Sequence, residues 1–362
     1  MNKFKAVFKV LGWVLAVTCV VCGAIFVPKL EFKTGENAIN DNFGGARETE
    51  SEILELWHVE TFEGGRISRA RWLENRAIEF EKKNPGVFVL IKEFSLDEFL
   101  NQLNQGKRAH LYSFSKGAET ALLERLSSLN SLNINLHETF KTVGDIGETR
   151  LAVPFAYSVY VALTVAKNLE MHESVSSLSS VIFSSGQIKK LRKKEKKIYS
   201  CVYGGAGEAT ALLNLRALDE FDTAGELGIF AGCEKLSTYD AYCKFLTGDA
   251  AILAGTMRDV IRLENKVLTG AVEDVYFEAL GHFTDLVCFL GADKSNTDKE
   301  RAAANKYIEF VLSEAVQTKV AGLGLLSPTT RNVHESGALK IIEKQAENIV
   351  PLKLFGKNQN LN

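Results

Sequence analysis

The sequence predicts an α/β protein built as two lobes, and three observations support this. Strand-like and helix-like segments alternate between residues 53 and 114, the order expected of a parallel sheet with crossover helices. A second unit of strand, glycine loop and helix begins much later, near Ile198. The 362 residues also exceed what one hydrophobic core usually supports.

The first strand, Ile53–Glu60, opens into a turn that contains Gly64 and Gly65. Apolar residues at mostly helical spacing predict a helix over Arg69–Lys83, and Asn84-Pro85-Gly86 ends it. Open α/β sheets bind ligands at the carboxyl edge of their strands, where helix N–H groups are free. We therefore expect the functional residues to lie at that edge.

Shorter elements follow: a strand over 87–94, a helix over 96–105 and a strand over 110–114. The apolar run 151–165 is too long for one small strand, and we expect it to cross between the lobes. The second unit has its strand at 198–203 and its helix from about Glu208.

The glycine loop of the second unit, Gly204–Gly207, is a candidate phosphate cradle. However, Thr210 stands where a dinucleotide motif needs glycine or alanine, and no P-loop lysine follows. The other interpretation is a turn that presents backbone N–H groups to a neutral ligand. Both remain open.

Composition indicates a folded chain, with 46% hydrophobic and 24% charged residues. Four lysines and no acid lie in the first thirty residues, so the other 39 basic and 45 acidic residues leave the rest with a net charge of −6. An acidic body argues against binding to nucleic acid.

The amino terminus predicts a membrane anchor or an export signal. Lysines in residues 1–9 precede an unbroken apolar run, and together they predict a cytoplasmic start, a span over 10–28 and a flexible linker over 29–52. A linker of this length spans about 25 Å. Cleavage after Ala24 is an alternative, whereas Cys19 and Cys22 lack the small preceding residue of a lipidation site.

Export would permit disulfides among the remaining cysteines. Cys288 lies in an apolar run and Cys201 in a predicted strand, so we expect both to be buried free thiols. Cys233 with Cys243 is the pair worth testing. Because no CxxC or HxxxH spacing occurs in the body that begins near Ile53, we predict no metal site and no cofactor.

Several motifs occur in the order found in the family 1 extracellular solute-binding proteins of ABC importers, best known from sugar uptake, and the chain resembles that family. The resemblance covers about residues 53–328. It rests on Trp57-His58, Trp72-Leu73, Phe80-Glu81, Asn84-Pro85-Gly86-Val87, Ala152-Val-Pro-Phe155, the run 245–256, and the late helix and turn 318–328.

The resemblance implies the type II clamshell of periplasmic binding proteins, in which a hinge closes two α/β lobes over a ligand. Lobe 1 would comprise 53–153 plus 284–325, and lobe 2 would comprise 156–282 plus 327–362. Sugar clefts use aromatic faces to stack on pyranose rings and planar polar groups to bind hydroxyls.

Candidate ligand contacts in lobe 1 lie after its first and third strands. They are Trp57, Glu60, Thr61 and Phe62, then Tyr112, Ser113, Phe114 and Ser115. For the aromatic residues, core packing is an equal alternative. Glu60 is the sharpest candidate, because an acid at the end of an apolar strand needs water, a partner or a ligand. His110-Leu111 departs from the acidic residue common in the family.

Candidates in lobe 2 and at the return crossing are Tyr157, Tyr203, Gly205, Thr256, Arg258, Phe283 and Asp285. Arg258 matters most, because a guanidinium can bind a hydroxyl pair or a carboxylate with two hydrogen bonds. The alternative is that Arg258-Asp259 and Arg262 to Glu264 are solvated charges on a helix.

We therefore expect a membrane-tethered protein, not an enzyme, that captures a small polar solute, a sugar or oligosaccharide, for an ABC permease. A ligand sensor for a signalling partner is one alternative. A surface glycoside hydrolase using Glu60 and Asp285 is another, although no Gly-x-Ser-x-Gly motif supports hydrolysis. The basic run 189–197 suggests contact with an acidic polymer or lipid, or simply a solvated surface.

Overall fold

A computed structural model describes residues 51–165, 199–204, 233–272, 274–280 and 283–355. The expected anchor, residues 29–50 of the expected linker, the basic run 189–197, the helix expected from Glu208, and Gly205 lie outside these ranges. Glu52, expected at the end of the linker, is instead the first residue of a strand. Among the described residues, no helix combines the length and apolarity needed to cross a membrane.

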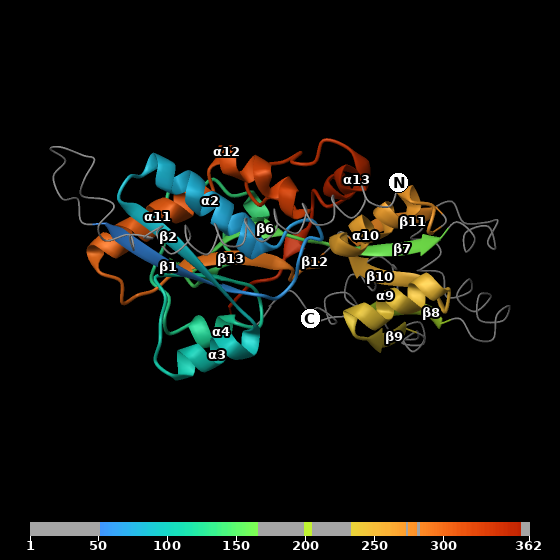
Figure 1. The fold of residues 1–362 in the computed structure, drawn as a ribbon, viewed down its shortest axis with the longest axis horizontal. Helices are drawn as coiled ribbons and strands as arrows, with labels where there is room; N and C mark the ends of the chain where they lie inside the picture. The colour runs from blue at the N-terminus through green and yellow to red at the C-terminus, as the bar shows by residue number, and fades with distance from the viewer. Residues whose placement is uncertain (1–50, 166–198, 205–232, 273, 281–282, 356–362) are drawn as a thin grey trace, which may run out of the picture. The chain divides into compact units, whose positions relative to one another are not determined.

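The first sheet has five strands in the order β2-β1-β3-β13-β6 (Figure 1). β1 (Glu52–Val59) runs parallel to β2 (Val87–Phe94) and to β3 (Leu111–Phe114). β13 (Val287–Ala292) is antiparallel to β3 and to β6 (Val153–Tyr157). The parallel arrangement expected from the segments between residues 53 and 114 is therefore correct for β1, β2 and β3, and β13, which returns from the second half of the chain, adds an antiparallel strand.

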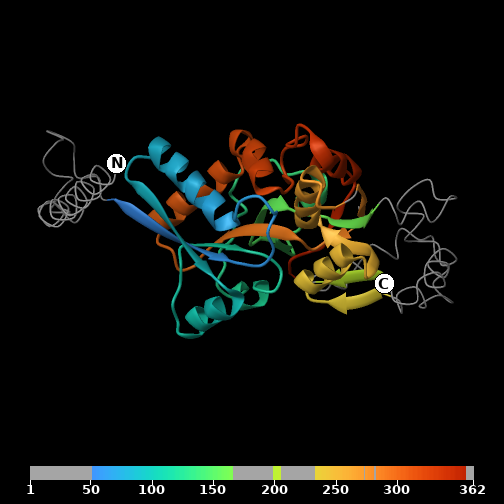
Figure 2. The ribbon, with the colours of Figure 1, turned by 45° about the vertical axis from the view of Figure 1, so that its right-hand side comes forward.

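Helices cover both faces of this sheet, as Figures 1 and 2 show. α2 (Arg69–Lys83) and α11 (Asp298–Val311) pack on one face, with Trp72, Phe80 and Tyr307 in a buried core. α3 (Leu96–Asn104) and the short α4 (Glu119–Leu122) lie on the other face. The Ser68 hydroxyl starts α2 by accepting the Arg71 N–H at 3.2 Å, which satisfies one free donor of the first turn.

The second sheet has the order β11-β7-β10-β8-β9. Its strands are β7 (Tyr160–Val165), β8 (Tyr199–Gly204), β9 (Cys233–Leu236), β10 (Ala250–Thr256) and β11 (Val275–Leu280). β8 runs parallel to β9 and β10, whereas β7 is antiparallel to β10 and β11. Three helices pack against this sheet: α9 (Thr238–Thr247), α10 (Met257–Leu268) and α13 (Gly337–Gln345).

The chain crosses between the sheets where the long apolar run predicts it. β6 ends at Tyr157 in the first sheet and β7 begins at Tyr160 in the second. The first lobe therefore reaches Tyr157, beyond the expected boundary at Val153. The chain returns through β12 (Phe283–Thr284), which pairs with β14 (Val350–Pro351). Backbone hydrogen bonds of 2.8 and 2.9 Å join Leu326 to Tyr157, after α12 (Glu314–Gln317) and the 3-10 segment η4 (Thr318–Leu323).

The structure describes the side chains of two cysteines, Cys243 and Cys288. Cys288 is a buried free thiol, as its apolar surroundings predict. Cys243 is also a free thiol, so the structure does not contain the disulfide considered for Cys233 and Cys243. Cys233 instead occupies the position opposite Cys201 in the register of β9 and β8.

Candidate functional site

The turn that follows β1 carries the exposed candidates of the first lobe. Glu60 and Thr61 are exposed, and Phe62 is half-buried. The Glu60 N–H donates to Phe94 O at 2.8 Å, so the backbone of this position is held beside the end of β2 while its carboxylate stays in water. This is the environment that an ionised acid at a strand end requires.

Arg69, which the sequence did not single out, anchors this turn. Its side chain is fully buried at the start of α2. Its guanidinium donates to Thr61 Oγ1 at 2.8 Å, lies 3.6 Å from Glu63 Oε1, and stands 4.9 Å from the centre of the Phe62 ring. A buried arginine is stable only with such partners. The contacts therefore stabilise the buried Arg69 side chain and also hold the turn in place.

Arg69 also reaches the ends of two neighbouring strands. Its Nη1 donates to Ser115 Oγ at 3.3 Å and to Cys288 Sγ at 3.2 Å. The Glu63 carboxyl is largely buried, and this burial raises its pKa although Arg69 opposes the rise. The Cys288 thiol has a raised pKa for the same reason, burial. The signal in the sequence was weak: an arginine at a helix start, six residues after an acid.

The other lobe 1 candidates are buried. Trp57 is 3% exposed and packs against the rings of Phe94, Phe99 and Tyr112, with centroids 5.1 to 6.2 Å apart. Phe114 is fully buried beside Phe289. These surroundings support the core-packing alternative for Trp57 and Phe114 in this conformation.

Ser113 belongs to a buried polar pair. Its hydroxyl lies 2.9 Å from His58 Nδ1, opposite it in the β1–β3 register, and neither residue is exposed. Burial and then the nearby Arg69 charge hold the pKa of His58 well below its usual value. Nε2 of this histidine has no hydrogen-bond partner among the described residues. His58 is therefore neutral in the folded protein.

In the second lobe, Thr256 and Arg258 begin α10 at the carboxyl end of β10. The Thr256 N–H donates to Asp259 Oδ2 at 2.9 Å, which caps the helix. Asp259 is 2% exposed and Arg258 is half-buried, so these two charges are not the freely solvated pair of the alternative interpretation. Tyr203 is 7% exposed on β8, opposite Ala254 of β10.

Glycines bring the carboxyl edge of the first sheet against α10. A Cβ added at Gly65 would lie 3.1 Å from Arg258 Cα, and one added at Gly324 would lie 2.5 Å from both Gly64 O and Ile261 Cδ1. Side chains at these positions would separate the segments. The turn after β1, the turn after η4 and the first half of α10 therefore meet in a close contact.

The crossing segments hold the remaining candidates. Tyr160 donates its hydroxyl proton to Asp285 Oδ1 at 2.8 Å, and Thr284 donates to Ser158 O at 2.7 Å. Burial and then the Asp285 carboxylate raise the pKa of Tyr160 well above its usual value.

Phe283 is half-buried in β12. Tyr157 is 7% exposed, with its ring 4.6 Å from that of Phe140. Through its hydrogen bond with Tyr160, Asp285 therefore links the two segments of the chain that cross between the lobes.

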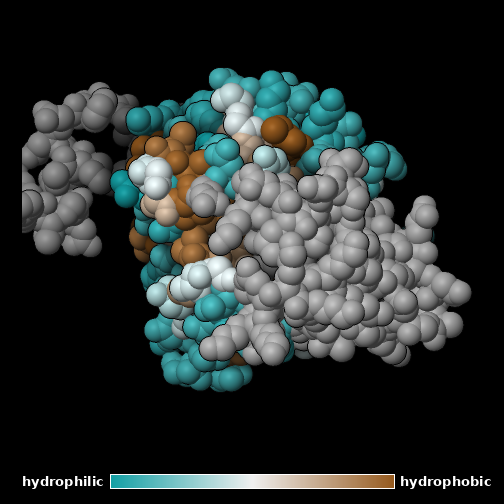
Figure 3. Space-filling view, turned by 90° about the vertical axis from the view of Figure 1, so that its right-hand side faces the viewer, coloured by the Kyte–Doolittle hydropathy of each residue, from teal (hydrophilic) through white to brown (hydrophobic). Residues whose placement is uncertain are grey.

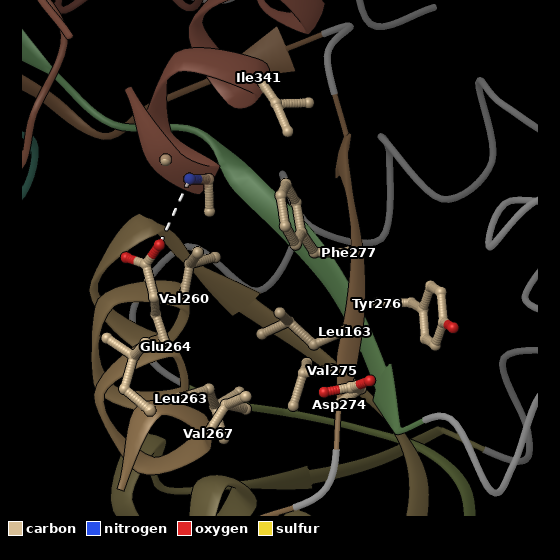
Figure 4. A pocket seen from close by; sticks show the side chains of 13 residues that line it. Leu163, Val260, Leu263, Glu264, Val267, Asp274, Val275, Tyr276, Phe277 and Ile341 are labelled. Atoms are coloured by element: carbon tan, nitrogen blue, oxygen red, sulfur yellow. Dashed lines mark hydrogen bonds between the residues drawn. The ribbon is translucent and has the colours of Figure 1, made fainter. Parts of the chain in front are cut away.

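A separate apolar groove of about 500 Å³ lies in the second lobe between α10, β11 and α13. Val260, Leu263 and Phe277 contribute side chains to it, and Tyr276 points to the other side of β11 (Figure 4). Hydrophobic residues also appear on the surface at this end of the molecule in Figure 3. No predicted ligand residue lines the groove, so it is distinct from the candidate site.

The described ranges contain no cluster of three or more histidine, cysteine, aspartate or glutamate side chains that could hold a metal. The candidate site consists of hydrogen-bonding groups and one aromatic ring. These residues are Glu60, Thr61, Phe62, Thr256 and Arg258. Ligand binding through directed hydrogen bonds is the chemistry that this set provides.

Comparison with solved structures identifies the fold. The sugar-binding protein MalE from Xanthomonas citri is similar with a TM-score of 0.60 at 16% identity, covering 83% of this chain and 86% of the other. The galacto-N-biose-/lacto-N-biose I-binding protein of the Bifidobacterium longum ABC transporter gives a TM-score of 0.58 at 9% identity, covering 84% and 87%. Maltose-bound MalE3 of T. maritima gives 0.57 at 16%, covering 83% and 89%.

No family model matches the sequence, and no curated protein matches it. The chain has the two-lobed α/β fold of MalE-type substrate-binding proteins of ABC transporters.

Proposed function

We propose that this chain is an extracellular solute-binding protein, held at the cell membrane by its amino-terminal segment. It captures a small polar solute, a sugar or oligosaccharide, between its lobes and delivers it to an ABC permease. The observation that carries the proposal is the contact of Gly65 with Arg258, because it joins the carboxyl edges of strands from two sheets. The likeness to sugar-binding proteins of known structure supports the choice of ligand class.

The exposed and half-buried side chains at this edge suit a hydroxyl-rich ligand. The Glu60 carboxylate accepts hydrogen bonds and the Arg258 guanidinium donates them, so together they can bind neighbouring hydroxyls in both directions. Phe62 packs against the core with the Arg69 guanidinium over its ring, and the exposed part of this half-buried ring is the aromatic surface proposed to contact a sugar ring. Binding and release require no catalytic group, and the proposal assigns none.

A ligand screen by thermal shift tests the proposal. A compound that binds only the folded state raises the melting temperature, by an amount that grows with its concentration above Kd. The full chain in detergent would be screened against oligosaccharides, amino acids, polyamines and peptides. Stabilisation by oligosaccharides supports the proposal. Stabilisation by another class alone would refute the sugar assignment, and stabilisation by none would refute solute binding.

Membrane attachment and delivery require separate tests. Mass spectrometry of the protein recovered from membranes would find the intact amino-terminal peptide if the segment is a retained anchor, and would lack it after cleavage. Uptake of the bound sugar by cells would fall when the chain is deleted if it serves a permease. Unchanged uptake together with a lost transcriptional response would favour the sensing role.

A further inference from the structure

The hydroxyl of Thr61, in the exposed turn after β1, has a single hydrogen-bond partner among the described residues. Arg69 Nη2 donates to Thr61 Oγ1 at 2.8 Å. A guanidinium carries only donors, whereas a threonine hydroxyl has one proton to donate and two lone pairs that accept. The direction of this hydrogen bond is therefore fixed: Arg69 donates and Thr61 accepts.

The proton of the Thr61 hydroxyl is left without an acceptor in the described part of the chain. Because the oxygen accepts from Arg69, the proton points away from the guanidinium. The side chain is exposed, so this proton is available at the carboxyl edge of the first sheet. The positive charge beside the oxygen strengthens the O–H as a donor and weakens the remaining lone pair as an acceptor. Thr61 therefore presents a hydrogen-bond donor at this edge.

Arg69 holds this orientation because its own side chain is fixed. The side chain is fully buried, and its Nη1 donates to Ser115 Oγ and to Cys288 Sγ while its Nε lies 3.6 Å from Glu63 Oε1. Oε2 of the same glutamate accepts the Arg69 backbone N–H at 3.2 Å. Contacts of this kind keep a binding group within the narrow range of positions that a ligand requires.

Ser115 offers an internal comparison, because its hydroxyl also accepts from Arg69, at 3.3 Å. It is 2% exposed, however, and it has a neighbour for its own proton. Burial raises the pKa of the Cys288 thiol, and the Arg69 charge and a hydrogen bond from Ser115 oppose that rise. The Ser115 proton is thus used inside the protein. Of the two hydroxyls that contact Arg69, that of Thr61 is the one whose proton can reach a ligand.

The residue next to Thr61 lies against the same guanidinium. The ring centre of Phe62 is 4.9 Å from the end of the Arg69 side chain. Arg69 therefore fixes the position of a donor and of an aromatic ring on adjacent residues. A pyranose offers both of the complementary features, oxygen atoms that accept hydrogen bonds and an apolar face.

We propose that Arg69 is a positioning residue of the ligand site, and that the Thr61 hydroxyl it orients donates a hydrogen bond to one oxygen of the bound sugar. This role rests on the proposed function, because it concerns the ligand of the same site. It makes the site selective for a sugar that places an acceptor oxygen beside Thr61. A sugar with only hydrogen at that position loses the hydrogen bond and binds more weakly.

Titration calorimetry of the full chain in detergent tests this role. The probe is maltose or, if maltose does not raise the melting temperature, the oligosaccharide of the thermal-shift screen that does. Each hydroxyl of the probe is replaced in turn by hydrogen or by fluorine, which accepts a hydrogen bond weakly and donates none. At one position, the deoxy sugar should bind about fivefold more weakly than the probe, and the fluoro sugar should bind more tightly than the deoxy sugar.

Thr61→Val removes the hydroxyl and keeps the shape of the side chain. It should weaken binding of the probe about fivefold and abolish the difference between the deoxy and fluoro sugars at that position. Thr61→Ser keeps the hydroxyl and should bind like the unchanged chain. Thr269→Val is the matched control: Thr269 is exposed at the far end of α10, and its hydroxyl donates within its own helix, to Asn265 O and Lys266 O. Its Kd should be unchanged.

Arg69→Lys tests the positioning role, because lysine keeps the charge without the second donor group that reaches Thr61. The readout is the ratio of the Kd values of the deoxy and fluoro sugars on this one variant, which a loss of stability alone does not change. The ratio should fall toward one. If the variant does not fold, the Thr61 variants still decide whether the hydroxyl donates.

The outcomes separate this role from the proposed function. Equal Kd values for Thr61→Val and Thr269→Val, with the unchanged chain binding the probe, would overturn the donor role alone. An unchanged deoxy-to-fluoro ratio in folded Arg69→Lys would overturn the positioning role of Arg69. If no oligosaccharide binds the unchanged chain, the proposed sugar ligand is refuted, and the role of Thr61 is refuted with it.

Discussion

Gly65, in the turn after β1, lies directly against Arg258, in the first turn of α10: a Cβ added at Gly65 would stand 3.1 Å from Arg258 Cα. The two residues come from different sheets and are far apart in the sequence. Their contact explains why glycine occupies this position. It also places the exposed turn of the first lobe beside the strongest lobe 2 candidate for ligand binding.

Gly65→Ala should weaken ligand binding, because the added methyl group pushes the turn away from Arg258. Gly106→Ala is a matched control: both glycines have positive φ, 92° and 77°, but a Cβ at Gly106 would meet nothing within 4 Å. Both variants should lose about 1 kcal/mol of unfolding free energy from backbone strain. Urea unfolding and calorimetry would separate the effects. Equal ligand affinity in the two variants would show that the contact is unimportant for binding.

Arg69→Met should destabilise the fold by about 3–5 kcal/mol, because it leaves the buried Glu63 carboxylate without its partner. The double variant Arg69→Met/Glu63→Gln should recover part of this loss, since no unpaired charge remains. Urea unfolding measures both. A double variant less stable than Arg69→Met alone would contradict a pairing role for these residues.

Tyr160→Phe should lower the free energy of unfolding by about 1 kcal/mol through loss of the hydrogen bond to Asp285. Tyr276→Phe removes a hydroxyl from a half-exposed tyrosine in the same lobe and should change stability by less than about 0.5 kcal/mol. Identical unfolding curves for the two variants would exclude a stabilising role for the Tyr160–Asp285 bond.

His58 should make the protein less stable in mild acid. Its folded pKa lies well below the usual value of 6.5, so below about pH 6.5 the unfolded chain binds a proton that the folded chain does not. Stability is therefore full above that pH and falls by about 1.4 kcal/mol per pH unit as the pH drops toward the folded pKa. His58→Asn should make the slope shallower in urea unfolding. A residual slope is expected, because burial also lowers the pKa of His137 and His334.

Local sequence patterns predicted many elements well. The predicted bounds of α2 and β2 agree with the structure, because a serine cap, the Asn-Pro-Gly stop and clear periodicity mark them. The apolar run at 151–165 indicated a crossing but not the break after Tyr157 that divides it into two strands. Nothing local shows that β13 returns antiparallel beside β3, because that pairing joins residues far apart in the sequence.

The candidate site was predicted only in part. Glu60 and Thr61 are exposed as expected, because polar residues after an apolar strand must leave the core. Trp57 on β1 and Phe114 on β3 are buried, and the strand pattern alone could not decide between core and cleft for them. Arg69 was missed because an arginine near a helix start is ordinarily solvated, and only the fold brings Thr61, Ser115 and Cys288 around it.

Titration of the full chain with an oligosaccharide that stabilises it, beside Arg258→Gln and the exposed α13 variant Lys340→Gln, tests the central claim most directly. A charged hydrogen bond contributes about 1.5–3 kcal/mol, so Arg258→Gln should raise Kd by about tenfold or more. Lys340→Gln should leave Kd unchanged. An unchanged Kd in Arg258→Gln, with the fold intact by circular dichroism, would contradict a sugar site at the meeting of Gly65 and Arg258.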